Sequence, residues 1–185
     1  LNSNSYTGGT YLNSGTLSIA SSGSLGTGDL RMNGGTLNIR YAGANVDLAN
    51  NLVISGSNNI YLGVAKNLGL NGTISGSGTL TLGNDGQNST IYLSGANTMT
   101  GGTITLANNT NSVRFANASA GNANVAWVVN NTGANKNTLD FTTGTISFGS
   151  LSGSGLLQAN NATGTKVISV GGLNTNSTFS GAIGG

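Results

Sequence analysis

Residues 30–39 read Leu-Arg-Met-Asn-Gly-Gly-Thr-Leu-Asn-Ile. Two apolar–polar–apolar triplets, Leu30-Arg31-Met32 and Leu37-Asn38-Ile39, flank a short run of Asn and Gly. Alternation with a period of two is typical of a β-strand that buries one face. Asn and Gly adopt positive φ angles at low cost, as a sharp corner requires. The stretch therefore predicts two short strands joined by a corner.

The same kind of triplet recurs along the chain. Successive runs begin roughly every ten residues, with Gly, Asn or Ser between them, which is typical of an all-β protein of many short strands. No window has the 3.6-residue period of a helix, so we expect essentially no α-helix. Sandwich, barrel and solenoid all remain open on this pattern. The further triplets are Leu17-Ser18-Ile19, Val46-Asp47-Leu48, Leu80-Thr81-Leu82, Ile91-Tyr92-Leu93, Ile104-Thr105-Leu106, Val113-Arg114-Phe115, Leu139-Asp140-Phe141 and Ile146-Ser147-Phe148.

The composition is unusual for a folded domain. Of the 185 residues, 32 are Gly and 29 are Asn, whereas Pro, Cys and His are missing. Charged residues make up 5% of the chain, against roughly a quarter in an ordinary domain. Disorder would go with low hydrophobicity, but 36% of these residues are hydrophobic and they recur in regular clusters. We therefore expect a folded chain.

Charge and hydropathy exclude two kinds of partner. The net charge is +2 and the six basic residues are scattered, so we expect no nucleic acid. No apolar run approaches the roughly 20 residues of a membrane-spanning helix, so we expect no membrane insertion. A cytosolic protein with so little charge would be poorly soluble. An extracellular location is therefore expected.

Internal repetition favours a solenoid over a sandwich or a barrel. Thr7-Gly8-Gly9-Thr10 recurs as Thr100-Gly101-Gly102-Thr103, 93 residues later. The same offset carries Val46-Asp47-Leu48 onto Leu139-Asp140-Phe141. Neither copy has a linker or a composition of its own, so one continuous stack of parallel strands is favoured.

We therefore expect residues 1–185 to form a single continuous β-solenoid of two degenerate copies, at about 1–92 and 93–185. Stacked Asn side chains are expected to bond to one another along its axis. A β-hairpin is a rival at Asn33-Gly34 and Asn71-Gly72, because Asn-Gly favours tight hairpins.

Residues 4–17, Asn-Ser-Tyr-Thr-Gly-Gly-Thr-Tyr-Leu-Asn-Ser-Gly-Thr-Leu, resemble the autotransporter-associated β-strand repeat, also called the passenger-associated transport repeat. Residues 93–103 give a second match, and Gly78-Thr79-Leu80-Thr81-Leu82 resembles the strand that precedes it in the family. The second copy departs from the family pattern after Thr103. The resemblance implies a right-handed parallel β-helix from a large, secreted or surface-exposed bacterial protein. It implies no catalytic residue.

The residue types also argue against catalysis and cofactor binding. Without His or Cys, the usual nucleophilic triads cannot form. Asp47 and Asp140 are expected at equivalent, solvated positions one whole copy apart, too far for the paired carboxylates of a glycosidase. Residues 84–88, Asn-Asp-Gly-Gln-Asn, predict a turn rather than a calcium loop. We therefore expect a non-enzyme without metal or cofactor.

Exposed aromatic side chains are the candidates for glycan binding. Tyr61 and Tyr92 stand between apolar neighbours and should point outward, whereas the apolar run around Trp127 predicts a core or interface strand. Such binding requires an outward ring. The full set of candidates is Tyr6, Tyr11, Tyr41, Tyr61, Tyr92 and Trp127.

The leading hypothesis is a structural extracellular module that stacks end to end: a stalk, fibre or filament subunit, or an autotransporter passenger segment. Neither end has the features of a cap, and the segment Phe179–Ile183 resembles what precedes the family motif that begins again at Asn4. The expected contact therefore involves Tyr6, Phe179 and Ile183. The partner is either a copy joined head to tail or adjoining repeats of a longer chain. A glycan-binding adhesin is the alternative, and a polysaccharide-cleaving enzyme a more distant one.

Overall fold

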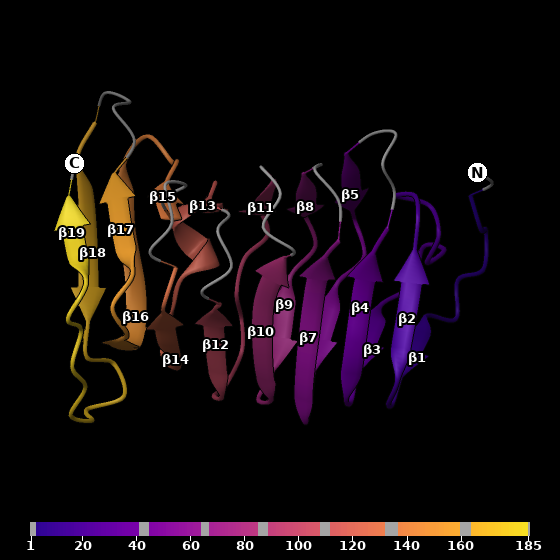
Figure 1. Cartoon of the computed structure of the whole chain (residues 1–185), viewed down its shortest axis with the longest axis horizontal. Helices are drawn as coiled ribbons and strands as arrows, with labels where there is room; N and C mark the ends of the chain where they lie inside the picture. The colour runs from indigo at the N-terminus through magenta and orange to yellow at the C-terminus, as the bar shows by residue number, and fades with distance from the viewer. Residues whose placement is uncertain are drawn as a thin grey trace.

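The computed structural model is a right-handed parallel β-solenoid of about seven coils (Figure 1). It describes residues 3–40, 45–63, 67–84, 89–107, 112–131, 137–159 and 164–184. Within these ranges every strand pair is parallel, and the only helical element is a 3₁₀ turn, η1, at Ala118–Ala120. The expected all-β solenoid is confirmed.

Each coil contributes strands to up to three sheets, which we call A, B and C. Sheet A has the order β1 (Thr10–Leu12), β3 (Leu30–Met32), β6 (Leu52–Ile54) and β9 (Ile74–Gly76). Sheet B runs through β2 (Thr16–Ile19), β4 (Gly35–Ile39), β7 (Ser57–Leu62), β10 (Thr79–Asn84), β12 (Thr103–Leu106), β14 (Asn122–Val129), β16 (Gly144–Ser152) and β18 (Lys166–Val170). Sheet C runs through β5 (Val46–Leu48), β8 (Leu68–Leu70), β11 (Thr90–Leu93), β13 (Ser112–Phe115), β15 (Asn137–Leu139), β17 (Leu156–Ala159) and β19 (Ala182–Gly184).

The two Asn-Gly sites are corners and not hairpins. Asn33-Gly34 joins β3 of sheet A to β4 of sheet B, and Asn71-Gly72 joins β8 of sheet C to β9 of sheet A. Strands in different sheets do not pair with each other, so each strand instead pairs with its counterpart one coil away. The rival hairpin prediction is therefore wrong at both sites.

The core consists of apolar side chains stacked row upon row. In sheet B, Leu37 pairs with Ile60, and the row continues through Leu82, Leu106 and Val129, each at most 2% exposed. Partners in this row are 22 to 24 residues apart, which is the length of one coil. Parallel strands lie about 4.8 Å apart, so neighbouring side chains of a row touch along the axis.

Three aromatic side chains fill the core farther along the axis. The rings of Phe115, Trp127 and Phe148 contact one another at centroid distances of 5.3 to 5.9 Å. Each side chain is at most 1% exposed. Tilted and edge-to-face pairs of this kind contribute about 0.5–1.5 kcal/mol each beyond their area burial. The apolar run around Trp127 is therefore a core strand.

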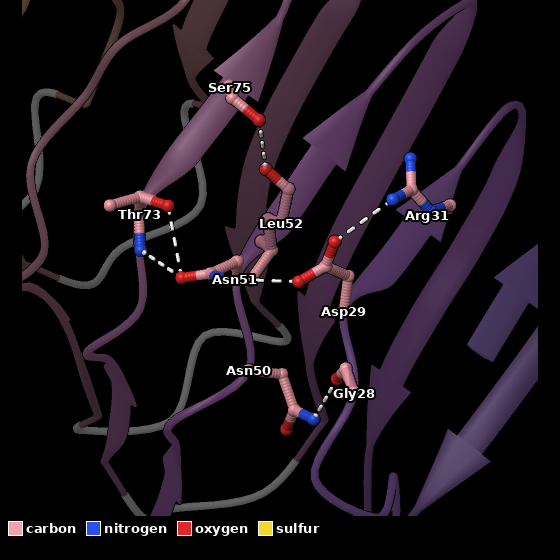
Figure 2. A network of polar contacts seen from close by, with 8 residues as sticks. All are labelled: Gly28, Asp29, Arg31, Asn50, Asn51, Leu52, Thr73 and Ser75. Atoms are coloured by element: carbon pink, nitrogen blue, oxygen red, sulfur yellow. Dashed lines mark hydrogen bonds and ion pairs between the residues drawn. The ribbon is translucent and has the colours of Figure 1, made fainter. Parts of the chain in front are cut away.

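The corners carry a second, polar set of contacts along the axis (Figure 2). The Asn51 amide donates to Asp29 Oδ1 at 3.2 Å, and its Oδ1 accepts from the backbone N–H and hydroxyl of Thr73 at 3.1 and 3.0 Å. Asn50 turns into the corner, where its amide donates to the carbonyl of Gly28 at 2.7 Å. Asn51 thus links its own coil to the coils on both sides.

Direct bonds between stacked asparagines also form, as expected. Asn33 Nδ2 donates to Asn13 Oδ1 at 2.7 Å, and Asn122 Nδ2 donates to Asn97 Oδ1 at 3.2 Å. Asn13 and Asn33 lie just after β1 and β3, so their bond extends the hydrogen bonding between coils into the corner. Asn122 is the first residue of β14, and its bond to Asn97 adds a side-chain contact at the start of that strand.

Alanine substitutions at the two glycines of the second Thr-Gly-Gly-Thr run are predicted to differ in their effect on stability. Gly102 has a φ of +91°, and a Cβ there would collide with the carbonyl oxygen of Gly78, whereas a Cβ on Gly101 would meet nothing within 4 Å. Gly102→Ala should lower the free energy of unfolding by about 2 kcal/mol or more, because both strain and a backbone clash oppose it. Gly101→Ala is the matched control and should change it by less than about 1 kcal/mol. Guanidinium denaturation followed by circular dichroism measures both, and equal effects would contradict this account.

The corner contacts give a second prediction. Asn51→Ala removes the bonds to Asp29 and Thr73 and should lower the free energy of unfolding by about 1–2 kcal/mol. Asn124 is also exposed, and its side chain makes no hydrogen bond within the described ranges, so Asn124→Ala is the control. Thermal melts of the two variants compare them directly. Identical melting temperatures would show that the corner bonds contribute nothing net.

Candidate functional site: the two ends of the solenoid

The residues predicted to join units end to end do lie at the ends. Tyr6 lies in the segment before β1, and Ile183 lies on β19. β1 and β19 are at opposite ends of the long axis (Figure 1). Phe179 bridges to Gly153 and packs partly buried against the core near that same C-terminal end. The structure thus separates Tyr6 from the other two within one molecule, as a head-to-tail contact requires.

At the C-terminal end, no described coil covers the last inward-facing side chains. Val170 of β18 pairs with buried Phe148, and Ile183 of β19 pairs with buried Leu157. Both therefore occupy inward positions, yet they are 47% and 55% exposed. No described coil lies against their outer side, because β18 and β19 are the edge strands of sheets B and C. This end therefore presents apolar side chains on two edge strands.

The N-terminal end is better covered. The segment before β1 runs along the first coil: Asn4 N–H donates to the Gly23 carbonyl at 2.9 Å, and Thr27 N–H donates to the Tyr6 carbonyl at 3.0 Å. The first inward side chains, Leu12, Ile19 and Leu25, are only 2 to 6% exposed. The N-terminal end therefore leaves less of its apolar core uncovered than the C-terminal end does. Tyr6 itself remains 42% exposed, and its hydroxyl is hydrogen-bonded to Thr10 Oγ1.

The two Thr-Gly-Gly-Thr runs occupy different corners. Thr10 opens β1 in sheet A, whereas Thr103 opens β12 in sheet B. Their second glycines, Gly9 and Gly102, have φ angles of +82° and +91°. The shared motif therefore marks a left-handed glycine that leads into a strand and does not mark one fixed place in the coil. Its eight residues are Thr7, Gly8, Gly9, Thr10, Thr100, Gly101, Gly102 and Thr103.

The carboxylates expected at equivalent positions are not equivalent. In sheet C, Leu48 stacks through three intervening coils onto Leu139, so Asp47 precedes this row and Asp140 follows it. Asp140 is also not simply solvated: its Oδ2 lies 3.3 Å from Arg114 Nη1, and its side chain is 19% exposed. Four coil spacings of about 4.8 Å separate the two carboxylates, roughly 19 Å. This exceeds the roughly 5–10 Å that glycoside hydrolysis requires.

The aromatic candidates divide between surface and core. Tyr61 and Tyr92 lie half-buried on outward positions, as expected, and Tyr11 is 62% exposed. The Arg31 guanidinium lies 5.9 Å from the Tyr11 ring centroid, and that of Arg114 lies 5.8 Å from the Tyr92 centroid. Trp127 is fully buried. Tyr41 and most of the turn at 84–88 lie outside the described residues.

The described residues contain no group of three or more His, Cys, Asp or Glu side chains that would hold a metal ion. No helix in the same ranges has the length and apolar character needed to cross a bilayer.

Comparison with models of protein families, with curated proteins and with solved structures finds no match for this chain. The fold defines its class as a parallel β-solenoid, and the resemblance to the autotransporter repeat rests on the motifs of the sequence.

The separation of the carboxylates predicts that the protein does not cleave polysaccharides. Incubation with pectin, xylan, cellulose and chitin should release no reducing ends above a heat-treated control. If turnover appears, and Asp47→Asn or Asp140→Asn abolishes it, the non-enzymatic interpretation is wrong.

Proposed function

We propose that the chain is a structural module of an extended extracellular β-solenoid, in which the N-terminal end of a second copy stacks on the C-terminal end of the first. The observation that carries the proposal is the half exposure of Val170 and Ile183 at inward positions. Their partners one coil earlier, Phe148 and Leu157, are at most 1% exposed, because β18 and β19 lie against them. A further coil would continue both rows.

The geometry favours a head-to-tail joint. All coils wind in one direction and all strand pairs are parallel, so an added coil in the same sense prolongs the ladders of sheets B and C. Such a contact joins two different surfaces and does not close on itself, so repeating it generates a filament. The exposed side chain of Tyr6 lies at the end that would meet Val170 and Ile183.

The composition supports a role outside the cell. A chain without Cys needs no particular redox environment, and one with 5% charged residues is better suited to a packed, repetitive assembly than to a crowded cytosol. The resemblance to the autotransporter passenger repeat points the same way. A further coil of one longer polypeptide would make the same contacts as a second copy.

Electron microscopy and sedimentation of the purified chain test the joint. Wild-type protein should form unbranched filaments whose population grows with concentration. Val170→Asp should prevent them, because it places a charge in the inward row of the last coil. Val167→Asp is the matched control: Val167 is also 47% exposed, but it pairs with exposed Thr145 on the outward side of the same strand.

Circular dichroism should show that both variants keep the fold, and Ile183→Lys gives a second disruption of the same surface. Monodisperse wild-type monomers at hundreds of micromolar would refute stacking of separate copies and leave the continuing polypeptide as the source of the next coil. Filaments that survive Val170→Asp and Ile183→Lys would place the joint elsewhere.

A further inference from the structure

The outward face of sheet B has a hollow beside Tyr61. Tyr61 of β7 pairs with Asn38 of β4 on one side and with Gly83 of β10 on the other. Because Gly83 has no side chain, one flank of the tyrosine is left open. Among the described lining residues, the next coil contributes the methyl group of Ala107, whose N–H bonds to the Leu82 carbonyl at 3.0 Å. Two small residues in succession thus leave a gap in the row.

The hollow has a polar edge and an aromatic wall. Its volume is about 240 Å³. Thr36, Asn59 and Thr81 stand in register on successive strands, two residues before the row of Tyr61, and therefore on the same face of the sheet. They supply two hydroxyls and one amide along one side. No charged side chain is among the described residues that line the hollow.

These features restrict the ligand. A charged group would be partly desolvated without an ionic partner, which is unfavourable. Drug-sized ligands occupy pockets of about 300–1,000 Å³, so this hollow suits a smaller unit. A neutral pyranose combines an apolar C–H face, which packs on an aromatic ring, with hydroxyls at its rim that bond to hydroxyl and amide groups. Its shape and polarity match the wall and the edge of the hollow.

We propose that the hollow at Tyr61 binds one neutral pyranose unit of a glycan chain, with the ring of Tyr61 as its platform and Thr36, Asn59 and Thr81 as its hydrogen-bonding edge. The polar row continues on Thr16 in one direction and on Thr105 in the other. A glycan lying along the solenoid axis would therefore meet further hydroxyls beyond the central unit. The proposal is independent of end-to-end stacking.

Two other surface features fit a sugar less well. The Tyr92 ring carries the Arg114 guanidinium, which is itself paired with Asp140, so an ion pair lies over that aromatic surface. A larger groove of about 450 Å³ lies around Asn97 and Asn122, but no aromatic side chain is among its described lining residues. Of these three surfaces, the Tyr61 hollow is the one whose described residues combine an aromatic ring with an uncharged polar edge.

The test measures binding of defined oligosaccharides by calorimetry and by chemical-shift changes. The neutral probes are tetramers of cellulose, maltose-type glucan, mannan and chitin, and the charged probe is tetragalacturonate. At least one neutral tetramer should bind the wild-type chain more tightly than the charged one. Tyr61→Ala should weaken that binding at least tenfold, corresponding to about 1.4 kcal/mol. Gly83→Val, which fills the hollow, should abolish it.

Two variants serve as controls. Tyr61→Phe keeps the platform and should retain affinity to within about threefold of wild type. Tyr92→Ala removes an outward aromatic of similar exposure from sheet C and should leave binding unchanged. If no neutral tetramer binds, or if Tyr61→Ala and Gly83→Val bind as wild type does, the proposal is wrong. A preference for tetragalacturonate would also overturn it, because the hollow offers no cation.

Discussion

Parallel, in-register stacking is the constraint on which the whole molecule depends. Each side chain lies about 4.8 Å from its counterpart one coil away, so every row along the axis must tolerate its own repetition. Apolar rows such as Leu37, Ile60 and Leu82 become more stable by stacking because they exclude water. Like charges at that spacing repel one another by about 1 kcal/mol even in water. A chain built this way therefore cannot place like charges on neighbouring positions of one row without that cost.

The two ion pairs among the described residues agree with this rule. Arg31 is paired with Asp29 and Arg114 with Asp140, and each guanidinium also lies near a tyrosine ring of the adjacent coil. Thr, Ser and Asn fill the outward rows, because their neutral groups can both donate and accept hydrogen bonds from a copy of themselves. The low charge that first indicated an unusual protein is therefore a consequence of the stacking and not a separate property.

The local part of the fold could be predicted from the sequence, but the pairing between coils could not. The triplets of residues 30–39 became β3 and part of β4, because alternation and glycine content act locally. The match between the motifs that begin at Thr7 and Thr100 suggested a wrong alignment of the two halves of the chain. The left-handed glycine of the motif leads into a strand of sheet A in one case and of sheet B in the other. For the same reason Asp140 was expected on the row of Asp47, which in the structure passes through Thr138, two residues earlier. Tyr61 was expected outward, but the hollow beside it depends on Gly83, which only the register brings next to it.

The single tryptophan acts as a built-in spectroscopic reporter of this architecture. Trp127 is fully buried between two phenylalanine rings, and it is the only indole in the chain. In a stack where each coil contacts only its neighbours, unfolding can begin at one end and stop before the other. Because Trp127 lies toward the C-terminal coils, its fluorescence reports the loss of that half. Backbone circular dichroism averages over the whole length, so a gap between the two transitions would reveal unfolding coil by coil.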